Sequence, residues 1–406
     1  MNIRLGKTML SLALASATLT GCSGGASTGQ KAEDNVSAFR EGLPPVIRDG
    51  DKLALTDPNT DYMLALRSAA LKLTGNYPTQ VEIAELQAAA DQPTTYANRI
   101  NDYMSRPAFA AQQVQFWRDT FRMGGTLTVQ VGAGMQSVSL ETAPTFAAQL
   151  VVQGLPWNQI VTQTKGTCPT FDATSGKFAP ADCTNTAGKP VVGVLTDAGV
   201  QAQFLSSLAF RRTRWVQETF MCSRFPAETS GKPTAYSGGA YSSPWPIASI
   251  TGSLNTAAPK IDFHDTSAVI CANCHTTMNH IAPLFANFDA VGNLTSTIQV
   301  ITPVPPNGLS LPTDWLPAGE GYAWRLGKPV TDLTSLGAAI AADPNLPVCV
   351  ASRMWNWAMS RGDIVNDQVA LTPQLANRLA GVLVQNNWNV KELVRQMFND
   401  PSFVRY

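Results

Sequence analysis

The stretch CANCHTTMNH, from Cys271 to His280, constrains this chain more than any other feature. It holds two of the seven cysteines and two of the three histidines within ten positions. Cys-x-x-Cys-His is typical of covalent haem attachment, because two thiols at this spacing reach both vinyl groups of a porphyrin and the next imidazole can bind the iron. We therefore interpret Cys271, Cys274 and His275 as the site of one covalently attached haem c, with His275 as the proximal iron ligand.

Two other interpretations of the motif remain open. A cysteine pair at this spacing can form a redox-active disulfide, which is typical of a βαβ unit that we do not find in this sequence. A zinc site needs two further Cys or His ligands, and only His264 and His280 are available. The sequence has no βαβ unit for a redox pair, and only His264 and His280 could complete a zinc site, so haem attachment is the favoured interpretation.

The second axial ligand of the iron is less determined by the sequence. His264 lies seven residues before Cys271, which is far enough to loop over the opposite face of the ring, and it is our first candidate. The other candidates are an open position, Met354, Met359, Met278 and His280. A methionine ligand would raise the reduction potential relative to a second histidine, and an open position would allow ligand chemistry.

Three residues after the motif have both a haem-related and a structural interpretation. Phe285 and Phe288 can wall a porphyrin or belong to an ordinary core. Asp289 can pair with a cation or cap the turn that follows it, and we expect the capping role.

The N-terminus resembles a bacterial lipoprotein signal. Arg4 and Lys7 precede the apolar stretch MLSLALASATL, which is too short to span a bilayer as a mature helix. It ends at Leu-Thr-Gly-Cys22, so we expect residues 1–22 to be a signal peptide with lipidation at Cys22; an ordinary secretory signal is the alternative. Because Ser23 follows the cysteine, we expect an exported lipoprotein of the outer membrane that faces the periplasm or the cell surface.

Export places the remaining cysteines in an oxidising compartment, where disulfides form. Cys168 and Cys183 flank the polar loop CPTFDATSGKFAPADC, which closure by a disulfide would stabilise by about 3 kcal/mol. Cys222 and Cys349 are the other candidate pair, and a bridge between them would tie the middle of the chain to its end. With Cys22 lipidated, only the two cysteines of the Cys-x-x-Cys-His motif are left for haem.

The remaining pattern predicts a mainly α fold with long Pro/Gly-rich loops. Apolar residues recur at helical spacing in YMLALRSAALKLTG, where Gly75 is a suitable C-cap. Pro78-Thr79 and Pro107 mark the starts of further helices. The other helical stretches are YANRINDYMS, TAPTFAAQLVVQGLPWNQIVTQ, AGVQAQFLSSLAFRRTRWVQETFMC, TDLTSLGAAIAAD, VCVASRMWNWAMSRG, TPQLANRLAGVLVQNN and NVKELVRQMFNDPSF.

The composition suggests where domains begin and which partners to exclude. We expect a flexible tether over 23–58, an N-terminal helical domain with the closed loop over 59–190, a haem c-binding domain over 191–300 and a C-terminal helical domain over 301–406.

Lys+Arg and Asp+Glu are equal at 29 each, so no net field would attract nucleic acid. Three histidines, two of them in the stretch from Cys271 to His280, leave little basis for a hydrolytic triad.

Several stretches also share a pattern with known proteins: LRSAALKLTGNYPTQVEIAEL, YMSRPAFAAQQVQFWRDTFR, FRRTRWVQETFMCSRFPAE, CANCHTTMNHIAPLFANFDAVGN and CVASRMWNWAMSRG. Together they resemble the planctomycete-type cytochrome c family, exported helical proteins of unassigned function built around one Cys-x-x-Cys-His motif. The resemblance covers most of the chain from about residue 60. It implies an upstream histidine, matched by His264, and supports pairing of Cys222 with Cys349. His280 stands where the family usually has proline, and the arginine that it has after Gly292 is absent.

These observations lead us to expect a membrane-anchored monohaem cytochrome c that passes single electrons between redox partner proteins at the periplasm or cell surface. Its membrane contact would be the lipid anchor. The alternatives are a haem enzyme or small-ligand sensor with an open distal site, and a surface lipoprotein that handles polymers. The sequence leaves open whether the protein is an enzyme, and a non-catalytic role in electron transfer is favoured.

Overall fold

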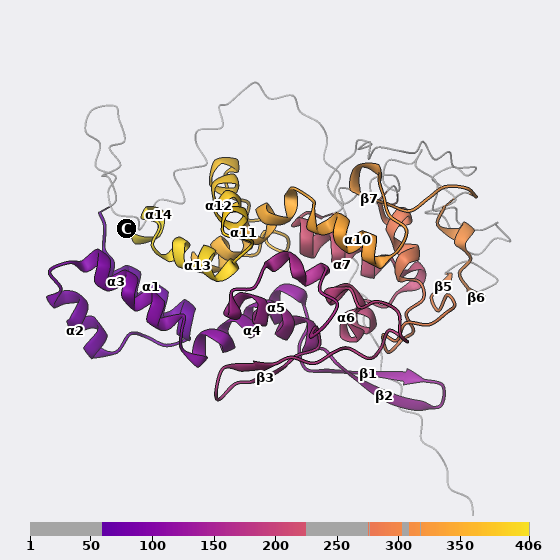
Figure 1. The fold of residues 1–406 in the computed structure, drawn as a ribbon, viewed down its shortest axis with the longest axis horizontal. Helices are drawn as coiled ribbons and strands as arrows, with labels where there is room; N and C mark the ends of the chain where they lie inside the picture. Colours follow the sequence, from indigo (N-terminus) through magenta and orange to yellow (C-terminus); the bar gives the residue numbers. More distant parts are fainter. Residues whose placement is uncertain (1–58, 225–274, 276, 303–307, 317, 406) are drawn as a thin grey trace, which may run out of the picture. The chain divides into compact units, whose positions relative to one another are not determined.

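Helices make up most of the described chain, which confirms the prediction of a mainly α fold (Figure 1). The computed structural model describes residues 59–224, 275, 277–302, 308–316 and 318–405. The α-helices are α1 (Tyr62–Thr74), α2 (Gln80–Ala88), α3 (Gln92–Tyr103), α4 (Pro107–Phe121), α5 (Thr142–Gln153), α6 (Ala198–Gln203), α7 (Phe210–Met221), α10 (Leu333–Ala341), α11 (Asn345–Ala358), α12 (Pro373–Gln385), α13 (Val390–Phe398) and α14 (Pro401–Val404). The 3-10 helices are η2 (Trp157–Val161), η3 (Gly193–Thr196), η4 (Ser207–Ala209), η6 (Ala282–Phe285), η7 (Pro312–Asp314) and η8 (Arg325–Gly327).

Local capping signals fix the first helices where the sequence predicts them. The carboxylate of Asp61 accepts hydrogen bonds from the backbone N–H groups of Met63 and Leu64, which begins α1. Gly75 ends α1 in the left-handed conformation at φ 73°, which glycine adopts without strain. Thr79 caps α2, and its side chain and that of Glu82 form a reciprocal capping box.

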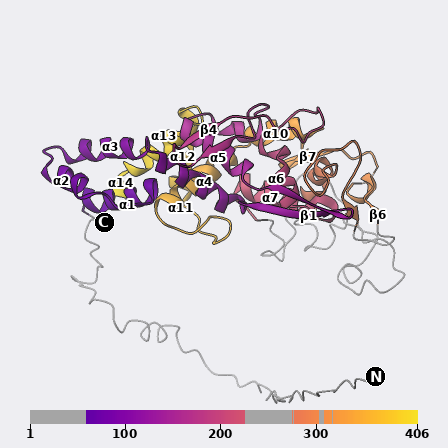
Figure 2. The ribbon, with the colours of Figure 1, turned by 90° about the horizontal axis from the view of Figure 1, so that it is seen from below.

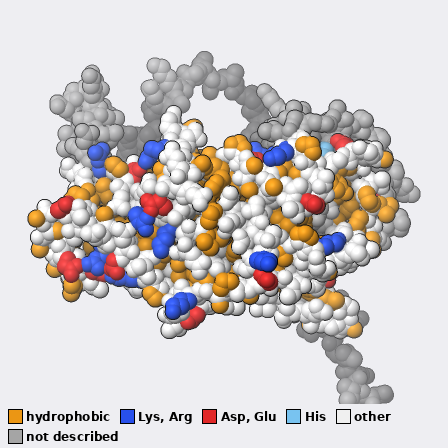
Figure 3. All heavy atoms as spheres, in the orientation of Figure 1, with side chains coloured by type: hydrophobic (Ala, Val, Ile, Leu, Met, Phe, Trp, Pro, Cys, Tyr) orange, Lys and Arg blue, Asp and Glu red, His pale blue; other side chains and the backbone are white. Residues whose placement is uncertain are grey.

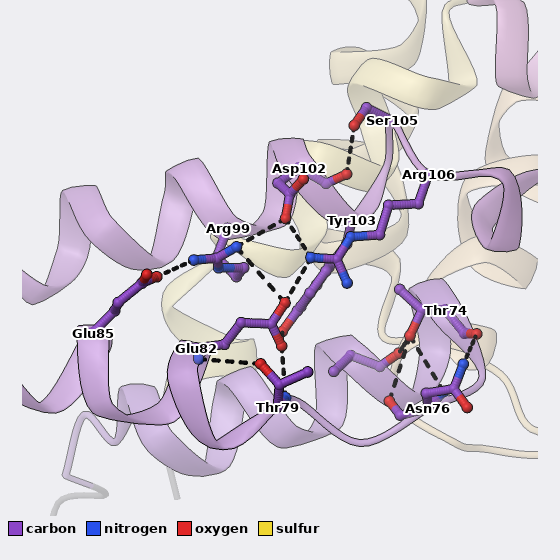
Figure 4. Close-up of polar contacts among 11 residues, drawn as sticks. Thr74, Asn76, Thr79, Glu82, Glu85, Arg99, Asp102, Tyr103, Ser105 and Arg106 are labelled. Atoms are coloured by element: carbon purple, nitrogen blue, oxygen red, sulfur yellow. Dashed lines mark hydrogen bonds and ion pairs between the residues drawn. The ribbon is translucent and has the colours of Figure 1, made fainter.

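The buried carboxylate of Glu82 also organises an ion network between α2 and α3 (Figure 4). One carboxylate oxygen accepts a hydrogen bond from Arg106 at 2.6 Å, and the other accepts from the Tyr103 hydroxyl at 3.2 Å. Burial opposes ionisation of Glu82, but the hydrogen bonds from Arg106 and from the Thr79 backbone hold its pKa below the ordinary value. The carboxylate therefore stabilises the N-terminal helices in its charged form.

The N-terminal helices pack against the C-terminal ones, so the two ends of the described chain share a core. Helices α1, α3 and α14 lie together in both ribbon views (Figures 1 and 2). The backbone N–H of Asp61 donates to the carbonyl of Val404 at 2.8 Å, and the Tyr96 hydroxyl donates to the carbonyl of Phe398 at 2.8 Å. Residues from Pro58 onward cluster into one compact unit. The boundaries that we expect inside it, after 190 and 300, stay predictions.

Both candidate disulfides are present. Cys168 pairs with Cys183 across 15 residues, and Cys222 pairs with Cys349 across 127 residues. The first closes the loop that contains strands β3 (Thr170–Asp172) and β4 (Lys177–Ala179). The second joins the C-terminal end of α7 to α11, so it fixes the helix that precedes the Cys-x-x-Cys-His segment onto the C-terminal helices.

Two features depart from the helical stretches that the sequence predicts. The first is a set of antiparallel two-stranded sheets: β1 (Thr126–Val131) with β2 (Gly134–Ser139), β3 (Thr170–Asp172) with β4 (Lys177–Ala179), β5 (Ile301–Thr302) with β6 (Gly308–Leu309), and β7 (Ala323–Trp324) with β8 (Lys328–Pro329). The second is a break in the stretch predicted as one helix before Cys222. Leu208 and Ala209 take φ values of 55° and 54°, and they separate α6 from α7.

The surface and the helix lengths add two observations. On the face drawn in Figure 3, basic and acidic side chains lie in small mixed groups among apolar ones.

Among the described residues, no single helix is long and apolar enough to cross a membrane. Helices α10 and α11 meet that criterion only as a pair, and they are bent by 66° at the break between them.

Candidate functional site

The described residues include one of the three predicted haem-attachment residues. His275 is described, whereas Cys271, Cys274, the candidate ligand His264 and the lipidation site Cys22 lie outside the described residues. The four cysteines of the two disulfides are paired with each other, so these bridges do not use the thiols of the motif.

His275 is held by a hydrogen bond to a buried amide one helical turn later. His275 and residues 277–281 are helical, which places His275 and Asn279 on the same face. The His275 Nδ1 lies 3.0 Å from the Oδ1 of Asn279, which is fully buried, and the His275 and Phe210 rings form a T-shaped pair with centroids 4.9 Å apart. Because an amide oxygen only accepts, Nδ1 carries the proton and the lone pair of the neutral ring is on Nε2. This is the tautomer that a histidine needs to bind a metal through Nε2.

The segment after the motif is held by a fully buried arginine on α7. The Nε and Nη2 groups of Arg212 donate to the carbonyl oxygen of Gln201 at 2.9 and 2.7 Å. Nη1 donates to the carbonyls of Phe285 and Phe288 at 2.8 and 3.2 Å, and Nη2 donates to that of Asp289 at 3.2 Å. These contacts match the five N–H donors of a guanidinium group. Burial lowers the pKa of Arg212 to about 9, opposed by the charge of Asp289, so the side chain is charged at neutral pH.

The turn that follows is fixed by its own side chains. Asp289 Oδ1 accepts from the backbone N–H groups of Val291 and Asn293 at 3.0 and 2.8 Å, so the expected capping role is confirmed. Gly292 has a φ of 82°, and a Cβ there would lie 2.1 Å from the carbonyl oxygen of the first residue of α6. The Asn185 amide donates to the Gly292 carbonyl at 2.7 Å. Close packing therefore requires glycine at 292, and the hydrogen bonds of Asp289 fix the turn before it.

The other candidate iron ligands have their own surroundings. His280 Nε2 lies 3.2 Å from Glu320 Oε1, so the structure pairs this histidine with a carboxylate. Met354 is fully buried in the main hydrophobic cluster, and Met359 packs against that cluster. Phe285 and Phe288, which can wall a porphyrin or belong to an ordinary core, are likewise fully buried in this cluster.

Two residues of this arrangement were missed by sequence reasoning. Arg212 stands between Arg211 and Arg214 in a helix, where a run of cations is typical of a solvated surface. Asn279 could have been found from the sequence, because it follows His275 by four residues and side chains at this spacing in a helix are neighbours. Within the described part of the chain, no three His, Cys, Asp or Glu side chains converge on a metal site.

Residues 192–297 match the family model PSCyt3. Its description is "Protein of unknown function (DUF1588)". The matched range contains the Cys-x-x-Cys-His motif, Arg212 and the turn at Asp289, and it fits a planctomycete-type cytochrome c family. No curated protein and no solved structure matches this chain.

Proposed function

We propose that this protein is a monohaem c-type cytochrome that transfers single electrons at the periplasm or cell surface, with a lipid anchor at Cys22. The observation that carries the proposal is the orientation of His275. Its Nδ1 lies 3.0 Å from Oδ1 of Asn279, and His275 is the last residue of the Cys-x-x-Cys-His motif. The cytochrome-like family match over 192–297 supports the same conclusion.

The residues around His275 fit a haem. Cys271 and Cys274 would form the thioether bonds, and His275 would bind the iron through Nε2. The haem, when bound, supplies a one-electron carrier. The tautomer fixed by Asn279 is the one this ligation requires, and the two disulfides do not consume the motif thiols.

The protein's own part in this function is to hold the ligand segment still. Asn279 fixes the ring of His275, and Arg212 ties the carbonyls of 285–289 to the end of α6. A rigid ligand segment keeps the geometry of the metal site alike in both oxidation states, which favours fast electron transfer. Redox partner proteins would dock nearby and exchange electrons, and nothing in this arrangement calls for nucleic acid.

We propose His264 as the second axial ligand. The pairing of His280 with Glu320 and the burial of Met354 in the core both support His264 over those two residues. Two histidine ligands would give a low-spin iron with a lower potential than a His/Met pair.

Voltammetry and absorption spectroscopy of the haem-loaded protein test this function. We expect one reversible one-electron couple and a low-spin spectrum that does not change with carbon monoxide. His264→Ala should convert the spectrum to high spin, whereas the matched variants His280→Ala and Met278→Ala should not. A high-spin wild-type spectrum that shifts with carbon monoxide would contradict electron transfer and favour an enzyme or ligand sensor with an open distal site.

A further inference from the structure

A cavity of about 300 Å³ lies away from His275, where α1, α4 and α11 meet the loop after α11. Lys72 comes from α1, Phe116 and Thr120 come from α4, and Trp357 comes from α11. The loop over 360–366 supplies the remaining wall, including Arg361. The volume is at the small end of the range for organic ligands.

The loop that forms one wall of this cavity is held by its own hydrogen bonds. Asp363 Oδ1 accepts from the backbone N–H groups of Val365 and Asn366 at 2.8 and 3.0 Å. Its Oδ2 lies 3.2 Å from Nε of the buried Arg353. Arg353 also donates to the carbonyl of Glu218 at the end of α7, at 2.9 Å. The loop therefore keeps its shape without a ligand.

The charges that line the cavity leave two cations without an acidic partner. Asp363 is paired with Arg353, and Asp119 accepts from Gln115 at 2.8 Å. Neither Lys72 nor Arg361 forms an ion pair with any residue in the described ranges. Lys72 is half-buried, and burial lowers its pKa from the ordinary value, as expected for an ammonium group that lacks a counter-charge. The lining has one net positive charge, which one ligand carboxylate would neutralise.

The apolar part of the lining is aromatic. The rings of Phe116 and Trp357 are 5.7 Å apart with an angle of 54° between their planes, and both side chains are half-buried. Such a pair offers a surface for a flat apolar group. The hydroxyl of Thr120 adds a neutral donor and acceptor beside it.

We propose that this cavity binds a small aromatic carboxylate. The carboxylate would pair with Lys72 and Arg361, and the ring would lie against Trp357 and Phe116. This site is separate from the proposed haem function, because none of its lining residues belongs to the segment around His275.

Isothermal titration of the full chain with benzoate, and with benzamide as a neutral analogue of the same shape, tests the proposal. We expect benzoate to bind at least about tenfold more tightly than benzamide, because a charge-assisted contact is lost in the amide. Lys72→Met and Arg361→Gln should each weaken benzoate binding by about tenfold. Arg361 is exposed, so its replacement should leave the fold intact.

The matched control is Lys391→Met. Lys391 is another lysine whose pKa burial lowers, but its Nζ lies against the Val152 carbonyl at 3.1 Å, away from the cavity. Its replacement should leave benzoate affinity unchanged. Absence of benzoate binding, equal affinity for benzamide, or an equal loss in Lys391→Met would each overturn the proposal.

Discussion

The imidazole of His275 and the amide of Asn279 are joined by a hydrogen bond of 3.0 Å between Nδ1 and Oδ1. Asn279 is fully buried, so this contact is shielded from competition by water. It makes Asn279 a positioning residue for the proposed iron ligand. An acceptor on Nδ1 raises the electron density of the ring and would so stabilise the ferric state of a haem bound through Nε2.

Replacing Asn279 should shift the reduction potential in opposite directions according to the new side chain. Asn279→Asp adds a stronger acceptor of nearly the same volume and should lower the potential. Asn279→Leu removes the acceptor and should raise it. We expect shifts of up to about 59 mV, a tenfold change in a one-electron equilibrium. Voltammetry measures both, and shifts of the same sign in the two variants would contradict the positioning role.

Arg212→Lys should loosen the segment after the motif. A lysine has three donors on one nitrogen and cannot reach carbonyls on both α6 and 285–289 as the guanidinium does. Hydrogen exchange over 282–294 should become faster. Arg353→Lys is the matched control, since Arg353 is also buried but binds carbonyls at the end of α7. If both variants accelerated exchange over 282–294 equally, the specific role of Arg212 would be refuted.

Asp197→Asn should make stability less dependent on pH. Asp197 caps α6 through Oδ1, its Oδ2 has no hydrogen-bond partner among the described residues, and burial raises its pKa to about 7. A raised folded-state pKa contributes stability below the unfolded value of 3.8, and this contribution is lost as the pH rises to about 7. The free energy of unfolding of the variant, relative to that of wild type, should therefore rise by up to about 4 kcal/mol between pH 4 and pH 8.

Denaturant unfolding at a series of pH values measures this gain. The control is Asp332→Asn at the cap of α10, where hydrogen bonds from Ser335 lower the pKa of an exposed carboxylate. That variant should lose stability relative to wild type as the pH rises. A parallel pH profile for Asp197→Asn and wild type would show that Asp197 does not titrate in this way.

Glu82→Gln should show the opposite dependence on pH. The pKa of Glu82 is lowered, so its contribution to stability is present above the unfolded value and is lost as the pH falls through the folded value. Losing the charged hydrogen bond to the partly exposed Arg106 should lower the free energy of unfolding by about 2 kcal/mol at pH 7. The difference from wild type should shrink toward pH 3. A loss that stays constant over this range would mean that the charge of Glu82 is not what stabilises the network in Figure 4.

Sequence reasoning located the elements whose signals are local. Thr79 and Glu82 form the capping box that their spacing allows, Gly75 ends α1, and Pro107 begins α4. The turn at Asp289 is likewise fixed by a side chain that bonds to its own backbone. Such interactions depend on residues within four positions of each other, so the sequence alone determines them.

The features that were missed depend on distant partners. The break between α6 and α7 interrupts a continuous helical pattern, and the Trp315 indole donates to the Leu208 carbonyl at this break at 2.9 Å. Arg212 binds carbonyls more than seventy positions away, and backbone acceptors leave no mark in a sequence. The hairpin of β1 and β2 is an exception, because β1 alternates polar and apolar residues in TLTVQV, a local strand signal that the sequence offered and that was not used.

Mass spectrometry of the protein, matured in a host that attaches haem c, tests the central claim most directly. We expect the mass of one haem per chain, retained after acid extraction and lost in the double variant Cys271→Ser, Cys274→Ser. Cys168→Ser, Cys183→Ser should keep the haem, because this disulfide lies outside the motif. A wild-type chain with the mass of the polypeptide alone, or a haem that acid extracts, would contradict the account.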